Sequence, residues 1–243
     1  MLLNHFGIRI KDKPSNHINK ELYLTAKPEG LPNWTEAHYA QQLIKAEFNY
    51  DLNMAYFDSL DYDKFDEYTK KQIKKYKFVE CLDLNELKGA EGVYMLVLDN
   101  YKQVYIGQSQ DIKRRILNHW NGRKSLERLI FGDICSSILS IDSFGVLDTT
   151  RIFYIKTWSK YEKEEKIVAS FNAKYLLNRT AGGIGGADSY IYDVRSAMVA
   201  VVANQKKRNF LDYVDVNKLK EIVGEKSFNN YYLTKYPELE SDK

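Results

Sequence analysis

The chain is poor in residues that cross-link or interrupt a fold. Cys81 and Cys135 are the only cysteines in 243 residues, which excludes a disulfide framework and a cysteine-based zinc site. Both lie among apolar residues, so we expect buried free thiols. Three of the four prolines, Pro14, Pro28 and Pro32, fall near the start of the sequence, where we therefore expect irregular or short-strand structure.

Long apolar runs are absent as well. No stretch approaches the ~18 to 20 apolar residues of a membrane span, and residues 1–10 lack the features of an export signal. We therefore expect a soluble, cytoplasmic protein with no membrane partner. Neither sign of charge is in large excess, because 36 basic and 33 acidic residues give a formal net charge of +3. A phosphate-binding surface must then come from local clustering of cations.

Aromatic residues, in contrast, are abundant. Nineteen tyrosines and eleven phenylalanines accompany a hydrophobic content of 44%. That content is sufficient for one sizeable core with appendages or for two small domains. We expect most of the aromatic rings to pack within such a core.

Apolar periodicity predicts both strands and helices. Strand-length apolar runs and turn residues predict a hairpin of two strands, over 93–98 and 103–107. They also predict a third strand over 151–155 and a short strand or lead-in over 78–82. Helical spacing predicts three helices, over 63–76, over the residues that follow a cap at Ser109 or Asp111, and over 162–171.

Two short strings in the middle of the chain concentrate groups that can contact a phosphate. Gly92-Val93-Tyr94 is followed, one hairpin later, by Tyr105-Ile106-Gly107, and the two tyrosines can point from paired strands to one face. Arg115 and His119 are four residues apart and therefore share a helix face. Arginine offers a planar fork suited to phosphate, and histidine can transfer a proton near neutral pH.

Cleavage of a phosphodiester needs an activated water, positive charge on the non-bridging oxygens and help for the departing alkoxide. This segment can supply all three. Glu162, Glu164 and Glu165 begin a later helix, and one of them can bind Mg²⁺ with several waters retained. The pattern therefore favours the core of a nuclease.

Taken together and in order, these residues resemble the GIY-YIG endonuclease family. The residues on which the resemblance rests are Gly92-Val93-Tyr94, Tyr105-Ile106-Gly107, Arg115, His119, a later glutamate and Asn178. Val93 stands where the family pattern has isoleucine. The resemblance covers roughly residues 88–186, and the long stretch between His119 and Glu164 indicates an insertion or recognition loop.

The resemblance implies an α+β fold, with a small antiparallel β-sheet of about three strands flanked by helices. It also implies a division of the chain into three regions. We expect a mainly helical accessory or recognition region over 1–87, the catalytic core over 88–186 and a helical C-terminal extension over 187–243.

It further implies a one-metal nuclease in which two tyrosines and a histidine handle protons. Tyr94 would be the general base or position the water, and Tyr105 would hydrogen-bond in the same site and compete for that role. Because a phenol has an unperturbed pKa near 10, a tyrosine base needs a lowered pKa, from Arg115, a lysine or the metal. His119 would accept or relay a proton.

The remaining implied roles concern charge and positioning. Arg115 would hold the scissile phosphate, and Glu164 would ligate Mg²⁺, for which Mn²⁺ can substitute. Alignment of the apolar residues of the helix selects Glu164, with Glu162 and Glu165 as alternatives. Asn178 would orient groups of the site or hold the final loop in place.

Cations around the motif favour a cleft that faces DNA. The predicted DNA-binding residues are Lys113, Arg114, Arg123, Lys124 and Arg128. Our first hypothesis is a Mg²⁺-dependent type II restriction enzyme that cuts a short palindrome in double-stranded DNA as a homodimer. The second is a mobile-element, phage or repair nuclease that recognises DNA structure. A catalytically inactive DNA-binding scaffold is the third, and the intact motif argues against it.

Overall fold

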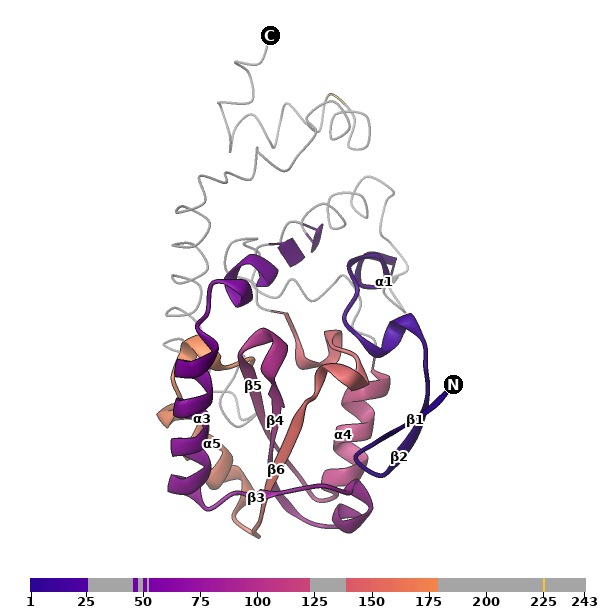
Figure 1. The fold of residues 1–243 in the computed structure, drawn as a ribbon. Helices are drawn as coiled ribbons and strands as arrows, with labels where there is room; N and C mark the ends of the chain where they lie inside the picture. The colour runs from indigo at the N-terminus through magenta and orange to yellow at the C-terminus, as the bar shows by residue number, and fades with distance from the viewer. Residues whose placement is uncertain (26–45, 48–49, 52, 123–138, 179–224, 226–243) are drawn as a thin grey trace.

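The computed structural model of the chain describes residues 1–25, 46–47, 50–51, 53–122, 139–178 and 225. These residues form an α+β fold with six strands in two antiparallel sheets, which confirms the predicted fold class (Figure 1). The strands are β1 (Leu2–His5), β2 (Ile8–Lys11), β3 (Val79–Glu80), β4 (Gly92–Leu98), β5 (Gln103–Ser109) and β6 (Arg151–Lys156).

Helices account for much of the remaining described chain. The α-helices are α1 (Lys20–Thr25), α3 (Tyr62–Tyr76), α4 (Ile112–Asn121) and α5 (Lys160–Ser170), and residues 53–58 are also helical. The 3₁₀ helices are η1 (Pro14–Asn16), η2 (Leu84–Leu87), η3 (Asp99–Tyr101), η5 (Ile141–Ser143), η6 (Val146–Asp148) and η7 (Ala173–Tyr175). None of the described helices is long and apolar enough to cross a bilayer.

The main sheet has four strands in the order β3-β6-β4-β5. It contains the predicted hairpin, β4 with β5, and the predicted third strand, β6. The segment expected to be a short strand or lead-in supplies the fourth strand, β3. All seven residues of β4 are buried, because strands flank it on both sides and helices cover both faces, and this explains its nearly continuous apolar sequence.

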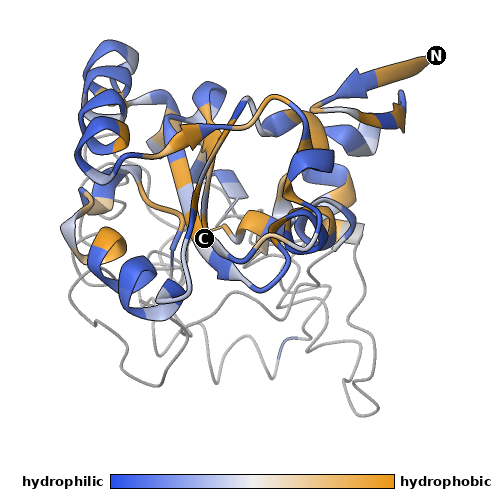
Figure 2. Cartoon of the chain, turned by 90° about the horizontal axis from the view of Figure 1, so that it is seen from below, coloured by the Kyte–Doolittle hydropathy of each residue, from blue (hydrophilic) through white to orange (hydrophobic). Residues whose placement is uncertain are grey.

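Helices lie on both faces of this sheet and enclose two cores. Val93, Met95 and Val97 of β4 pack with residues of α3 and α5 on one face. On the other face, Tyr94 and Leu96 pack with α4. Figure 1 shows α3 and α5 on one side of the sheet and α4 on the other, and in Figure 2 hydrophobic colour concentrates between these layers.

Local capping fixes where the helix of the motif begins. The Asp111 side chain accepts a hydrogen bond from the Arg114 amide at 3.0 Å, so Asp111, one of the two predicted caps, is the N-cap of α4. Ile112 and Ile116 then lie in the core beneath the helix. This placement sets the rotation of α4 and directs its Arg115 and His119 toward one end of the sheet.

The region 1–87 contains strands as well as helices. The hairpin of β1 and β2 turns through Phe6 and Gly7, both with positive φ, as a two-residue hairpin turn requires. Phe6 packs on Trp120 of α4 with ring centroids 6.5 Å apart. Figure 1 shows this hairpin outside α4, away from α3 and α5.

One buried carboxylate anchors the N-terminal segment to the rest of the molecule. Asp148 is fully buried and accepts hydrogen bonds from the Ile18 amide at 2.6 Å, His17 Nδ1 at 3.0 Å, the Tyr101 hydroxyl at 3.0 Å and the Gly145 amide at 2.7 Å. Segments that are far apart in sequence therefore meet at a single side chain.

Some predictions concern residues outside this description. Cys81 is a buried free thiol, as expected, whereas Cys135 lies outside the described residues. The same holds for the predicted helical extension 187–243, apart from the single helical residue Glu225.

Replacement of Asp148 by alanine is expected to destabilise the fold. Two backbone amides and the Tyr101 hydroxyl lose their acceptor inside the protein, which costs about 3 to 5 kcal/mol of unfolding free energy. Urea denaturation measures the difference. Asp58→Ala, at an exposed position, is the matched control and should change stability by less than about 0.5 kcal/mol; equal effects of the two substitutions would contradict the anchoring role.

Candidate active site

The predicted hairpin brings two phenols to one face of the sheet. Tyr94 pairs with Gly107 and Leu96 with Tyr105, so the two tyrosines are diagonal neighbours. Their ring centroids are 6.2 Å apart. The His119 ring lies beside both phenols, 6.1 Å from Tyr94 and 5.0 Å from Tyr105. The predicted convergence of these three side chains is therefore present.

Gly107 explains why the second string of the motif ends in glycine. It lies directly across the sheet from Tyr94. A Cβ atom at this position would overlap the Tyr94 phenol oxygen and press on the Tyr105 ring. Only glycine leaves room for Tyr94 to extend across the neighbouring strand toward α4.

A chain of hydrogen bonds links Tyr94 to a carboxylate through His119. The Tyr94 hydroxyl lies 2.8 Å from His119 Nε2, and His119 Nδ1 contacts Asp142 Oδ1 at hydrogen-bond distance. A carboxylate can only accept, so His119 donates from Nδ1, and in the neutral ring Nε2 must accept. Tyr94 is therefore the donor to His119.

Asp142 is a member of the site that sequence reasoning missed. It lies in η5, 23 residues beyond His119, and is 13% exposed. No motif marks it, because an aspartate in a loop is usually a turn or surface residue. Its role follows only from the fold, which packs η5 against α4.

Burial works against ionisation of both phenols. Tyr94 is fully buried, and this raises its pKa well above the ordinary value, with the nearby Tyr105 adding to the effect. Burial likewise raises the pKa of Tyr105 to about 12. The Arg115 guanidinium opposes both shifts and does not outweigh them. The lowered pKa that a tyrosine base needs is thus not supplied by Arg115 alone.

Glu164 is the glutamate of α5 that belongs to this cluster. It is 7% exposed, whereas Glu162 and Glu165 are exposed. Burial raises the pKa of Glu164 to about 7, and Arg115 draws it in the opposite direction. Its charge also acts on Tyr94 and Tyr105. Of the three candidate glutamates, the structure therefore places Glu164 nearest the other predicted residues.

The chemistry around Glu164 fits a Mg²⁺ ion. Its carboxylate accepts no hydrogen bond from the described residues and is not among their fully buried polar groups that lack a partner, so water or a cation can reach it. Among these residues no group of three or more histidine, cysteine, aspartate or glutamate side chains could hold a metal. One carboxylate completed by waters and substrate oxygens is a common arrangement for Mg²⁺ and does not suit a structural zinc ion.

Asn178 attaches the segment that follows α5 to β5, the edge strand of the sheet, by hydrogen bonds. Its Nδ2 donates to the Ile106 carbonyl at 2.6 Å, and its Oδ1 accepts from the Ile106 amide at 2.9 Å. Leu177 adds a bond from its amide to the Val104 carbonyl at 2.8 Å. These contacts correspond to the second predicted role, retention of the final loop, since both polar atoms of the Asn178 side chain bond to β5.

The predicted DNA-binding cations are only partly described. Lys113 donates to Asn85 Oδ1 at 2.6 Å, and Arg114 is exposed at the start of α4. Arg123, Lys124 and Arg128 lie outside the described residues.

Comparison of the chain with family models, with curated proteins and with solved structures finds no match. The assignment of the site therefore rests on its geometry and chemistry.

Glu164→Gln is expected to remove a pH-dependent loss of stability in the metal-free protein. Because the folded-state pKa of Glu164 is about 7 against an ordinary value of 4.5, the unfolded chain releases this proton first as pH rises. Wild-type stability therefore falls between the two values, by about 3 kcal/mol, and stays lower above them. Denaturation in EDTA at several pH values measures the effect.

The exposed Glu165 provides the matched control. The stability of Glu165→Gln should depend on pH as that of the wild type does, because an exposed carboxyl has nearly the same surroundings in the folded and the unfolded chain. If Glu164→Gln also follows the wild type through this pH range, Glu164 is not held in the environment described above.

Proposed function

We propose that the protein is a Mg²⁺-dependent DNA endonuclease of the GIY-YIG type. The observation that supports this most directly is the hydrogen bond from the Tyr94 phenol to His119 Nε2. It lies in a cluster with the other predicted catalytic groups, Tyr105, Arg115 and Glu164, and it supplies the proton acceptor that a buried tyrosine needs.

In the proposed reaction a water attacks the scissile phosphorus while Tyr94 takes its proton. The bond between phosphorus and the departing sugar oxygen breaks, and that oxygen takes a proton from solvent. The phenol oxygen passes its own proton to His119 Nε2 in the same step, so no free phenolate forms inside the protein. Asp142 then faces the resulting imidazolium as its counter-charge. This relay removes the obstacle set by burial, because the raised pKa of Tyr94 opposes a free phenolate and not a concerted transfer.

Arg115 is suited to the phosphate. It is the cation whose charge acts on both phenols and on Glu164. Its side chain is partly open to solvent, where a DNA strand can reach it. A planar fork beside the reacting oxygens stabilises the charge that develops as the water attacks.

Glu164 would hold the Mg²⁺ ion, with Mn²⁺ as a substitute. When bound, the ion supplies Lewis-acid stabilisation of the phosphate and of the departing oxygen. Glu164 contributes a buried carboxylate that a cation keeps ionised, and Tyr105 positions the phosphate or the water beside it.

Restriction of double-stranded DNA at a short palindrome, by a homodimer, is the biological setting we favour. Symmetric cleavage of both strands suits a two-fold protein. A mobile-element, phage or repair nuclease would use the same groups on branched or damaged DNA. Sequencing the ends of plasmid fragments distinguishes the two, since every cut made by a restriction enzyme should lie at the same short palindromic sequence.

Purified protein is expected to cut plasmid DNA only when Mg²⁺ or Mn²⁺ is present. Arg115→Ala and Glu164→Ala should each lower the cleavage rate by about 10²-fold or more, because each removes charge that stabilises the transition state. Tyr94→Phe should be similarly impaired. Gel-based cleavage and fluorescence anisotropy measure rate and binding separately, and the variants should still bind DNA.

Glu165→Ala and Lys166→Ala are the matched controls for charge, since both residues are exposed on α5. They should retain cleavage. Wild-type rates in Arg115→Ala and Glu164→Ala would show that these residues do not form the active site, and absence of any cleavage by the wild type would reject the endonuclease itself.

Asp142→Asn tests the proton relay. Without the carboxylate, the imidazolium of His119 loses its counter-charge, so we expect a rate about 10² lower. The acid limb of the pH–rate profile should also move to lower pH. Asp142→Glu should recover part of the rate. A uniform drop with an unmoved profile would mean that Asp142 only supports the fold.

A further inference from the structure

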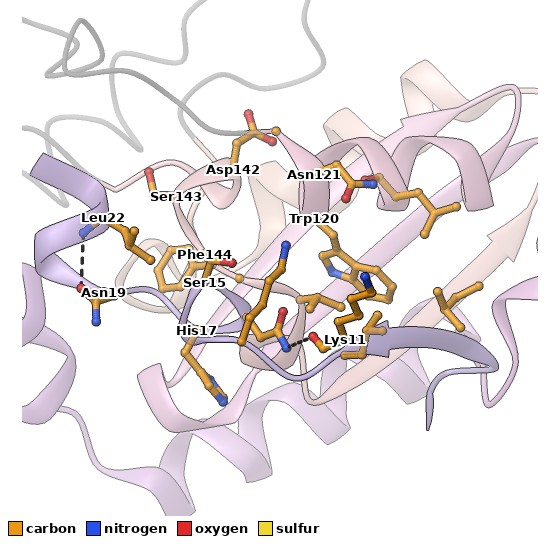
Figure 3. A pocket seen from close by; sticks show the side chains of 18 of the residues that line it. Lys11, Ser15, His17, Asn19, Leu22, Trp120, Asn121, Asp142, Ser143 and Phe144 are labelled. Carbon is orange, nitrogen blue, oxygen red and sulfur yellow. Dashed lines mark hydrogen bonds between the residues drawn. The ribbon is translucent and has the colours of Figure 1, made fainter. Parts of the chain in front are cut away.

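A groove of about 470 Å³ lies between the N-terminal segment and the end of α4. One side is formed by β2 and the residues that follow it. The opposite side includes Trp120 and Asn121 of α4 and Asp142 of η5, and Figure 3 labels them among the lining side chains together with Lys11. Because Asp142 also bonds to His119, the groove begins one side chain away from the proposed catalytic site.

Three cations line the N-terminal side of this groove. Arg9, Lys11 and Lys13 alternate with other residues along an extended segment, and Lys13 keeps extended dihedral angles beyond the end of β2. Alternation places them on one side of the backbone, roughly 7 Å apart. Ile8 and Ile10 alternate with them and line the groove as well, so both faces of β2 border it, whereas Asp12 is not part of the lining.

These cations have no acidic partner among the described residues. Some other basic side chains are paired: Lys20 with Glu47 and Asp51, Arg151 with Asp66 and Asp99, and Lys160 with Glu91. Arg9, Lys11 and Lys13 are all exposed and form no such pair. Within the part of the chain that the structure describes, three positive charges along one line therefore have no anionic partner of their own.

The segment that presents them is held in place at both ends. Phe6 and His5 pack on Trp120, with ring centroids 6.5 and 5.6 Å apart. After β2, the Asn16 side chain donates to the Lys11 carbonyl at 2.8 Å, and Asp148 fixes the next residues. A short hairpin has little stability alone, so this anchoring keeps the line of cations in a fixed relation to α4.

We propose that this groove binds the sugar–phosphate backbone of the DNA strand next to the cut. The inference rests on the proposed endonuclease activity. A regular line of cations matches the evenly repeated charge of a nucleic-acid strand better than the irregular charges of a protein surface. On the opposite side, the indole N–H of Trp120 donates to Thr149, which leaves the face of the ring for a sugar. Asn121 Nδ2 donates one hydrogen to the Leu117 carbonyl and keeps a second for a phosphate oxygen, and these contacts carry no base specificity.

The test replaces Arg9, Lys11 and Lys13 together by glutamine. The probe is a short, fluorescently labelled duplex from a plasmid that the wild type cuts. Its binding is measured by fluorescence anisotropy, with Ca²⁺ in place of Mg²⁺ so that the duplex is bound and not cleaved. Loss of three phosphate contacts should make the affinity for DNA less dependent on salt. Between about 50 and 200 mM salt, the affinity of the wild type should therefore fall by a factor about forty-fold larger than that of the variant. Thermal denaturation verifies that the variant is folded.

The matched control carries the same charge change on the other side of the sheet. Lys75, Lys163 and Lys166 line a separate hollow between α3 and α5, and their triple replacement by glutamine should leave the salt dependence close to that of the wild type. Equal slopes for the wild type and the Arg9, Lys11, Lys13 variant, with cleavage intact, would overturn the groove and leave the endonuclease standing. A wild type that neither cuts nor binds duplex DNA would overturn both.

Discussion

The hydrogen bond between the Tyr94 phenol and His119 is the contact on which the arrangement of the site depends. Both side chains are almost completely buried, and buried polar groups must find partners inside the protein. That requirement couples β4 to α4, and through Asp142 it couples both to η5. Gly107 must lack a side chain so that the phenol can pass, and the Asp111 cap sets the rotation that directs His119 inward. Small changes at any of these positions would break the chain of proton donors and acceptors.

Much of this arrangement is predictable because it is local. The apolar runs of β4 and β5 are close in sequence, and the Asp111 cap and the Arg115–His119 spacing lie within one helix. Each rests on a period or a turn that the sequence displays. The same reasoning fails for Asp142, since only tertiary packing brings it to His119. It also underdetermines Asn178, whose contacts with Ile106 exist only once the chain returns to the edge of β5. It gave no reason to expect that Arg9, Lys11 and Lys13 would line a groove beside α4.

The choice among Glu162, Glu164 and Glu165 shows the same limit from another direction. All three begin one helix, and helical periodicity alone leaves them as neighbours with similar chemistry. Burial separates them, because α5 packs Ile167 and Val168 against the sheet and so turns Glu164 inward while its neighbours stay exposed. A sequence pattern can name the element that supplies a ligand, but the side of that element that faces the site is set by packing.

Apart from Asp142, which is bonded to His119, the resting site carries little negative charge that could compete with a substrate. Tyr94 and Tyr105 are held neutral by burial, and a pKa of about 7 leaves Glu164 only partly ionised at neutral pH. Arg115 is then the strongest charge facing the cluster, which favours a phosphate. In the proposed reaction Glu164 would hold a divalent ion and would then be fully ionised, and Arg115 would face the phosphate. Metal and DNA would therefore each improve the binding of the other, since each supplies the charge that the other lacks in a site of low polarity.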